Sequence, residues 1–239
     1  MGYNHIFLYD NNEIDDERFE EVINDEIQNG FVSIINFRGK HKQPQFKVYI
    51  DCYEKNSKNY DWLSFFDSDE FLELKPKNIK IQQFLDNKRY NYCQNIKINW
   101  VLYTDNNKLS YENIQIQKRF TEALFNNSLN IHIKSTIRGN LSTNYWIGAI
   151  NPHSGRNKYN CCSSSGNQIS KNSPFNKPYD YKYAYLKHYM TKTIEEYIIK
   201  IKKGRAASKR INLKLMYNNF FNINKKTTEK LSIFKKAFN

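Results

Sequence analysis

The chain has 239 residues and a mass of 28.7 kDa, a length that favours one domain with at most a small appendage. Hydrophobic residues make up 39% and charged residues 26% of the sequence, which excludes a collagen-like fibre and a wholly disordered chain. No apolar run approaches the roughly 18–20 residues of a membrane-spanning helix. No signal peptide precedes the first strand-like segment, residues 5–9, so we expect a soluble protein.

The net charge of +13 is concentrated at one end of the chain. Residues 182–239 contain 15 Lys and Arg against 3 Glu, whereas the other 181 residues contain 22 basic and 21 acidic side chains. Such a segment favours a surface that meets anionic lipid or nucleic acid. The alternative interpretation is a solvated, lysine-rich tail that serves solubility.

The first half of the chain alternates strand-like and helix-like segments. Residues 5–9 predict a strand, residues 16–29 a helix and residues 31–37 a second strand. Residues 46–53 predict another helix and residues 62–66 a buried strand. Strands that alternate with single helices indicate an α/β fold with a mostly parallel central sheet flanked by helices.

The second half is less regular. Residues 96–100 predict a short strand, and residues 151–182, rich in Asn, Ser, Pro and Gly, predict a long loop over a site. Helical order returns at Thr193-Ile194-Glu195-Glu196, whose pattern is typical of a capping box. We expect Gly204 to end that helix.

The four cysteines are Cys52, Cys93, Cys161 and Cys162, and none lies in a C-x-x-C pattern. Neither a zinc site nor a disulfide framework is expected from so few cysteines at such spacings. The adjacent Cys161 and Cys162 are candidates for a redox pair, although we favour two free thiols in a reducing cytosol.

The most informative segment is a wholly apolar strand that runs into Asp67, Asp69 and Glu70. If the chain stays extended, Asp67 and Asp69 point to the same side. Two carboxylates at the carboxyl end of a buried strand suit a hard divalent cation, Mg²⁺ or Mn²⁺, that keeps positions open for phosphate oxygens. The alternative is an acidic turn in which Asp69 caps a short helix.

Asp10 ends the first predicted strand. We expect it along the same edge of the sheet, where α/β folds bind their ligands, and where it would hydrogen-bond a nucleotide ribose or base. A turn-capping aspartate is the alternative.

Four segments resemble, in order, the motifs of one enzyme family. Residues 2–12 are similar to a strand that ends in Y-D-N-x-S, and residues 60–71 to the box D-W-h-x-h-h-D-x-D-E-F, where h is apolar. Residues 134–138 are similar to K-S-I-V-R, and residues 188–206 to N-H-Y-x-x-K-S-x-E-E-F followed by R-G. The chain thus resembles glycosyltransferases of the GT-A fold, of the family 92 type and its bacterial family 2-like relatives.

The resemblance has departures. The family begins with a strand that carries an N-E pair and with an amphipathic helix, both before the segment that is Gly2-Tyr3 here. We therefore expect the chain to lack one core strand and part of the nucleotide pocket. Lys187 replaces the Asn before His188, and Gly139 follows Arg138 where the family often has Pro. Neither change removes an expected ligand.

The resemblance implies a GT-A-like catalytic domain over residues 1–192, short at its N-terminus, and a basic helical segment over residues 193–239. It implies the transfer, with inversion, of a sugar from a nucleotide-diphosphate donor, a UDP-sugar, to a glycan or lipid-linked acceptor. Mn²⁺ or Mg²⁺ is the implied cofactor, since the charge of the departing diphosphate must be neutralised.

The same resemblance suggests metal ligands. Asp69 would bind the ion, with Asp67 helping directly or through water and the ribose. His188 matches the late histidine that such enzymes add as a further ligand, and His153, in Asn-Pro-His-Ser-Gly, is the second candidate. For either histidine alone, a capping or packing role is the alternative.

Three basic residues are candidates for the phosphates. Lys192, four residues after His188, would reach the same diphosphate. Lys134 and Arg138 either face the phosphates or take part in a structural ion pair.

The catalytic base must be a carboxylate near the acceptor. Asp105 and Glu112 are candidates by location only, and each is an ordinary exposed acid in the alternative interpretation. Trp100, Tyr103 and Trp146 are candidates for stacking on sugar rings, with core packing the alternative for Trp100.

The main hypothesis is a metal-dependent glycosyltransferase of cell-surface or secreted glycans. We expect a cytoplasmic protein, peripheral on the inner membrane face through the lysine-rich segment, with no nucleic-acid partner. The alternatives are a nucleic-acid-binding protein that uses the basic C-terminus and a non-catalytic, glycan-binding relative.

Overall fold

The structure is a computed structural model. It describes residues 2–12, 17–39, 41, 44–141, 153–154, 159–169, 173–203, 213–229 and 231. Trp146, Gly204 and the Arg-Ala that follows Gly204 in the last motif lie outside these residues.

The N-terminal segment forms a small parallel pair of strands, β1 (Ile6–Asp10) and β2 (Val32–Asn36). Between them lie a 3₁₀ helix, η1 (Phe19–Glu21), and a short helix, α1 (Asn24–Gln28). The predicted strands are therefore present, whereas the single helix predicted over 16–29 is two short pieces. Neither piece contains a buried residue, so packing does not extend them into one helix.

The next two elements also match the prediction. Helix α2 (Pro44–Asn56) leads to strand β3 (Trp62–Phe65). Tyr53 of α2 is fully buried and packs in one apolar cluster with Leu63 and Phe65 of β3. This contact fixes the helix against the strand that carries the carboxylates.

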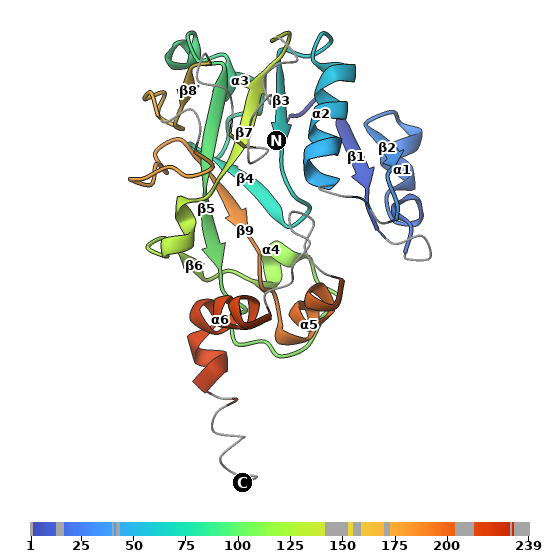
Figure 1. The fold of residues 1–239 in the computed structure, drawn as a ribbon, viewed down its shortest axis with the longest axis vertical. Coiled ribbons are helices and arrows are strands. Elements are labelled where there is room, and N and C mark those ends of the chain that lie inside the picture. The colour runs from blue at the N-terminus through green and yellow to red at the C-terminus, as the bar shows by residue number, and fades with distance from the viewer. Residues whose placement is uncertain are drawn as a thin grey trace.

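Within the described residues, the large sheet has seven strands, of which five form the path β3-β7-β5-β9-β4, while β6 and β8 each pair with β5 (Figure 1). The remaining strands are β4 (Glu70–Leu74), β5 (Asn95–Tyr103), β6 (Ala123–Leu124), β7 (Ile133–Arg138), β8 (Cys161–Cys162) and β9 (Ala184–His188).

This sheet is mixed, so the expected mostly parallel sheet is wrong. Strand β7 runs antiparallel to β3 and β5, and β4 runs antiparallel to β9, whereas β5 is parallel to β8 and β9. Single helices alternate with strands only as far as β3, and β4 follows β3 after four residues. A crossover to a parallel neighbour needs a dozen or more residues, so this connection cannot build one.

Short helices connect the later strands. They are α3 (Ile81–Leu85), η2 (Lys88–Tyr90), α4 (Ile116–Arg119) and η3 (Ser128–Ile131). The centre of the sheet is β5, in which Ile96, Ile98 and Leu102 have no exposed surface.

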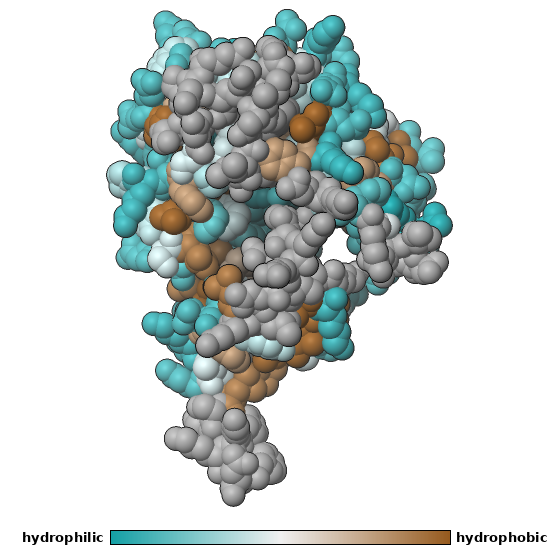
Figure 2. Space-filling view, viewed as in Figure 1, coloured by the Kyte–Doolittle hydropathy of each residue, from teal (hydrophilic) through white to brown (hydrophobic). Residues whose placement is uncertain are grey.

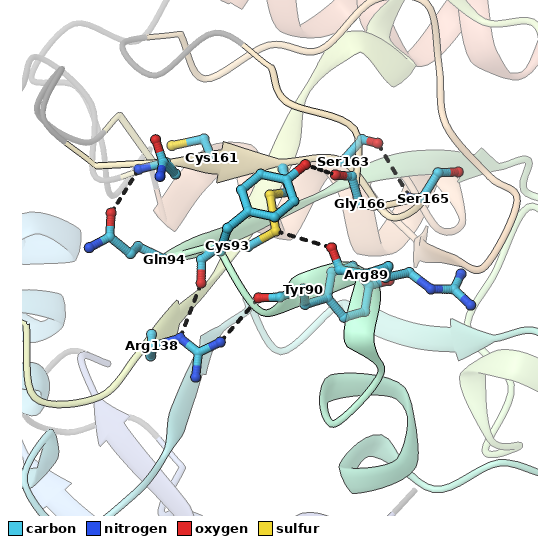
Figure 3. Close-up of a disulfide and its surroundings, with 12 residues drawn as sticks. Arg89, Tyr90, Cys93, Gln94, Arg138, Cys161, Ser163, Ser165 and Gly166 are labelled. Atoms are coloured by element: carbon cyan, nitrogen blue, oxygen red, sulfur yellow. Dashed lines mark hydrogen bonds between the residues drawn. A yellow bond between two sulfur atoms is a disulfide. The ribbon is translucent and has the colours of Figure 1, made fainter.

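A disulfide joins Cys93 to Cys162, with the two Cα atoms 5.9 Å apart (Figure 3). The expectation of two free thiols at Cys161 and Cys162 is therefore wrong for Cys162. The parallel pairing of β8 with β5 places Cys162 opposite Ile96, close to Cys93, and a pairing across 69 residues leaves no local signal in the sequence. Cys161 is buried and takes no part in the disulfide.

The C-terminal part forms helices α5 (Ile194–Lys203) and α6 (Leu213–Ile223), which lie together below the large sheet in Figure 1. The predicted capping box is confirmed, because Glu196 N–H donates to Thr193 Oγ1 and Thr193 N–H donates to Glu196 Oε2, at 3.2 and 3.3 Å. Tyr197 joins the helices by donating to the Met216 carbonyl at 2.8 Å. Among the described residues, no helix is long and apolar enough to cross a membrane.

Candidate functional site

The carboxylate segment is a tight turn between β3 and β4. Glu70 N–H donates to the Asp67 carbonyl at 3.0 Å, and Asp67 N–H donates to Glu70 Oε2 at 3.0 Å. The segment therefore does not stay extended: the acidic turn of the alternative interpretation is present, although a strand and not a helix follows Asp69. The turn buries the Glu70 side chain fully but leaves that of Asp67 45% exposed.

Lys134 is the buried cation of this turn. The antiparallel register places its neighbour Ser135 opposite Phe65, the last residue of β3. Lys134 Nζ lies 2.6 Å from Asp67 Oδ2 and 3.5 Å from Glu70 Oε2. Burial lowers the pKa of Lys134, but the two carboxylates outweigh it and hold the pKa well above its usual value. Lys134 therefore stays charged and fixes the turn.

Asp69 lies between an imidazole and an ammonium group. Pairing of β4 with β9 places His188 opposite Glu70, and His188 Nε2 lies 3.7 Å from Asp69 Oδ1 and 4.0 Å from Glu70 Oε1. On the other side, Lys200 Nζ of α5 lies 2.8 Å from Asp69 Oδ2. Strands and a helix that are distant in sequence thus converge on one carboxylate.

The electrostatics keep Asp69 ionised and His188 neutral. Burial lowers the pKa of His188 to about 4, against the opposing effect of Asp69. Burial raises the pKa of Asp69, but His188 and Lys200 outweigh it and hold the pKa below its usual value. At neutral pH the site therefore offers a carboxylate oxygen and a neutral imidazole nitrogen.

These two atoms fit a divalent cation. Metal–ligand bonds of about 2.1 Å allow two ligand atoms to lie up to roughly 4 Å apart, and Asp69 Oδ1 and His188 Nε2 are 3.7 Å apart. Glu70 Oε1, buried beside the same nitrogen, has no hydrogen-bond partner within the described part of the chain.

The same residues do not form a closed metal cage. Over the ranges that the structure describes, no three His, Cys, Asp or Glu side chains are grouped to hold an ion. Mg²⁺ is usually bound by only one or two carboxylates, with water and substrate phosphates completing its coordination, so a closed cage is not required.

A pocket of about 790 Å³ opens at this cluster. Asp67, Asp69, His188, Lys192 and Lys200 line one part of it. The other part is lined by residues of β1, α2 and β3, several of them aromatic, such as Tyr9, Tyr49 and Trp62. An apolar wall beside converging polar and charged groups is typical of a small-molecule binding site.

Lys192 reaches the pocket through an unusual backbone conformation. Its φ of 52° lies in the left-handed region, which costs energy for a residue other than glycine. Burial lowers its pKa, although Asp69 counteracts this. The structure thus brings together Asp67, Asp69, His188 and Lys192, with Lys134 directly behind Asp67.

Three other predicted binding residues, Asp10, Arg138 and His153, do not line the pocket. Asp10 is held by Arg38 Nε at 2.7 Å, and β1 pairs only with β2 among the described strands, so Asp10 does not share a sheet edge with the carboxylate turn. Arg138 lies at the far end of β7 and donates to two backbone carbonyls beside the disulfide, each at 3.1 Å (Figure 3). His153 is buried, and its ring centroid is 5.4 Å from that of Tyr49.

The two candidate bases do not line the large pocket. Asp105 is buried at a second pocket of about 500 Å³, where its N–H donates to Asn224 Oδ1 at 2.8 Å. Glu112 forms an ion pair with Lys108 at 2.6 Å. The identity of the base stays a prediction.

Two of the candidate stacking residues, Trp100 and Tyr103, lie within the described part of the chain, and both pack against other rings. The Trp100 ring lies against His132 and His188, with centroids 4.7 and 4.2 Å apart. Tyr103 packs against Tyr189. For Trp100, these contacts agree with the core-packing alternative.

Sequence reasoning missed Lys200 and the burial of Glu70. Lys200 belongs to the basic segment, whose charge indicated only a diffuse attraction. A local signal exists in retrospect: the capping box fixes where α5 begins and therefore the direction in which residue 200 points.

An α/β fold with a mixed sheet and a pocket lined by carboxylates, an imidazole and lysines is consistent with an enzyme that transfers sugars. The model of glycosyltransferase family 92 matches residues 1–235, nearly the whole chain. The chain therefore belongs to glycosyltransferase family 92 and is a glycosyltransferase. A comparison with curated proteins finds no match.

Proposed function

We propose that the large pocket binds a nucleotide-diphosphate sugar, a UDP-sugar, together with Mn²⁺ or Mg²⁺ held by Asp69 and His188. The observation that carries this proposal is the convergence of Asp69 Oδ1 and neutral His188 Nε2 at 3.7 Å, with Lys192 and Lys200 in the same pocket. The sugar moves to a glycan or lipid-linked acceptor with inversion.

Each residue of the site has a separate role in this proposal. Lys192 and Lys200 bind the diphosphate through charge-assisted hydrogen bonds. Lys134 holds Asp67 and the turn in place, so that Asp69 faces the pocket. When bound, the divalent cation supplies positive charge that stabilises the departing diphosphate. A carboxylate at the acceptor takes the hydroxyl proton, and Asp105 and Glu112 stay the candidates.

Two observations bear on the cellular compartment of the protein, and they favour different ones. A cytoplasmic protein on the inner membrane face suits a nucleotide-sugar donor. The Cys93–Cys162 disulfide, however, favours an oxidising compartment, since disulfides are rare in a reducing cytosol. We expect no nucleic-acid partner.

Calorimetric titration of UDP into the protein with Mn²⁺, and then with EDTA, tests the proposed site. We expect saturable binding that requires the metal and that is lost in Asp69→Asn. Asp61→Asn, which changes an exposed acid of the same segment, should bind UDP as the wild type does. A folded wild type that binds no UDP in either condition contradicts the proposal and favours a non-catalytic relative.

A further inference from the structure

Lys200 is the one residue of α5 that an ion pair joins to Asp69 among the described side chains. Its Nζ lies 2.8 Å from Asp69 Oδ2 and 3.0 Å from the Met190 carbonyl. Asp69 presents its other oxygen to His188 Nε2. An ammonium group therefore already neutralises the carboxylate to which a divalent cation would bind.

The two lysines that form ion pairs with the carboxylates of the turn, Lys134 and Lys200, differ in their freedom to move. The side chain of Lys134 is 3% exposed and lies between Asp67 and Glu70. That of Lys200 is 42% exposed and lines the pocket. If Lys134 moved away, the carboxylates that it pairs with would lose their buried counter-charge. The Lys200 ammonium, in contrast, can rotate into the pocket and stay solvated.

We propose that Lys200 is an exchangeable counter-ion: it neutralises Asp69 in the empty site and turns to the donor diphosphate when a divalent cation binds Asp69. This inference rests on the proposed function of the pocket. Two cations on one carboxylate repel each other, so occupation of Asp69 by a metal ion releases Lys200. The diphosphate then offers the released ammonium new oxygen partners.

The exchange links metal binding to nucleotide binding. In the empty site, Lys200 competes with a metal ion for Asp69 and so weakens metal binding. In the loaded site, the same lysine adds a contact to the diphosphate. Metal and nucleotide therefore favour each other's binding, as linkage requires.

The test measures Mn²⁺ binding to the protein alone, through the electron paramagnetic resonance signal of free Mn²⁺, and UDP binding at saturating Mn²⁺ by calorimetry. We expect Lys200→Met to bind Mn²⁺ alone about five- to tenfold more tightly, because its competitor is gone, and UDP about tenfold more weakly, the size of one charged contact. Lys200→Arg, which keeps the charge, should restore UDP binding. Lys202→Met, which changes an exposed lysine of the same helix, should alter neither affinity.

The outcomes separate this inference from the proposed function. A wild type that binds UDP with Mn²⁺, and a Lys200→Met variant with unchanged or weaker affinity for Mn²⁺ alone, overturn the exchange but leave the donor site. A folded wild type that binds neither Mn²⁺ nor UDP overturns both. Circular dichroism of each variant establishes that the comparison is made between folded proteins.

Discussion

Lys134 is a buried cation at the site on which the β3–β4 turn depends. It is 3% exposed and serves two carboxylates of the β3–β4 turn. Removing one partner of a buried ion pair leaves charge without compensation, which costs about 3–5 kcal/mol. We expect Lys134→Met to lower the free energy of unfolding by about 3 kcal/mol, since Asp67 keeps contact with water. Urea denaturation at neutral pH measures this loss.

The matched control is Lys55→Met. Lys55 pairs with Asp51 at 2.8 Å, but both side chains are well exposed, 65% and 39%. Such pairs contribute about 0–1 kcal/mol. Equal losses in the two variants would contradict a structural role for Lys134.

His153 gives the fold a dependence on pH. Burial, with the nearby charges of Lys134 and Lys97, lowers the pKa of His153 well below 6.5. Below about pH 6.5 the unfolded chain takes up a proton that the folded chain excludes, so stability falls as pH falls and is unaffected above that range. We expect the protonation of this residue to lower the free energy of unfolding by about 1 kcal/mol between pH 8 and pH 5.5.

His153→Gln isolates this contribution, because all other titrating groups are common to both proteins. The difference in unfolding free energy between wild type and variant should shrink by about 1 kcal/mol from pH 8 to pH 5.5. Urea denaturation at the two pH values measures it. A difference that is the same at both pH values rules the mechanism out.

At the scale of elements, the disulfide ties β8 to the start of β5. It closes a loop across 69 residues, and removal of a disulfide costs about 2–4 kcal/mol. We expect a reducing agent to lower the melting temperature of the wild type. Cys93→Ala should start from the lower value and not respond to reduction.

Cys161→Ala is the control for this prediction. Cys161 lies beside Cys162 in β8 and is equally buried, but it is outside the disulfide. This variant should keep the full response to reduction. A wild type that does not respond to reduction would show that the disulfide does not stabilise the fold.

The elements also show which parts of the fold can be predicted from the sequence alone. Strand β3, helix α2 and the capping box of α5 are encoded by local patterns, and the structure confirms each. Strand direction depends on which segments pair across the chain, and hydrophobic periodicity carries no information about that. The mixed sheet and the Cys93–Cys162 pair were therefore beyond local reasoning.

The candidate site shows the same contrast between what a local motif predicts and what depends on pairing across the chain. Asp67, Asp69, His188 and Lys192 belong to motifs, and these side chains meet at one pocket. Asp10 and Arg138 also belong to motifs, yet their partners are Arg38 and backbone carbonyls. A motif gives the residue type and its position along a strand, whereas the contact depends on which strand end lies beside it.

At the scale of the whole molecule, the segment that is most basic in sequence also contains two helices with exposed apolar side chains. The segment 182–239 carries most of the net charge. Figure 2 shows hydrophobic residues gathered over the lower part of the molecule, where α5 and α6 lie. The exposed apolar side chains of the two helices are Ile198, Ile199, Leu215, Tyr217 and Phe221. This combination suits an anionic lipid surface, since apolar and cationic groups both contribute to interfacial binding.

We therefore expect the protein to sediment with vesicles that contain phosphatidylglycerol and not with pure phosphatidylcholine, and to dissociate as salt is raised. The triple variant Lys202→Glu, Lys225→Glu, Lys226→Glu should bind such vesicles at least about tenfold more weakly, because each basic residue near the leaflet contributes about 1 kcal/mol. The control Lys58→Glu, Lys77→Glu, Lys88→Glu makes the same change of net charge at exposed positions outside the segment. Equal weakening in both variants would indicate attraction by net charge alone, and tighter binding to a single-stranded oligonucleotide than to vesicles would favour the nucleic-acid alternative.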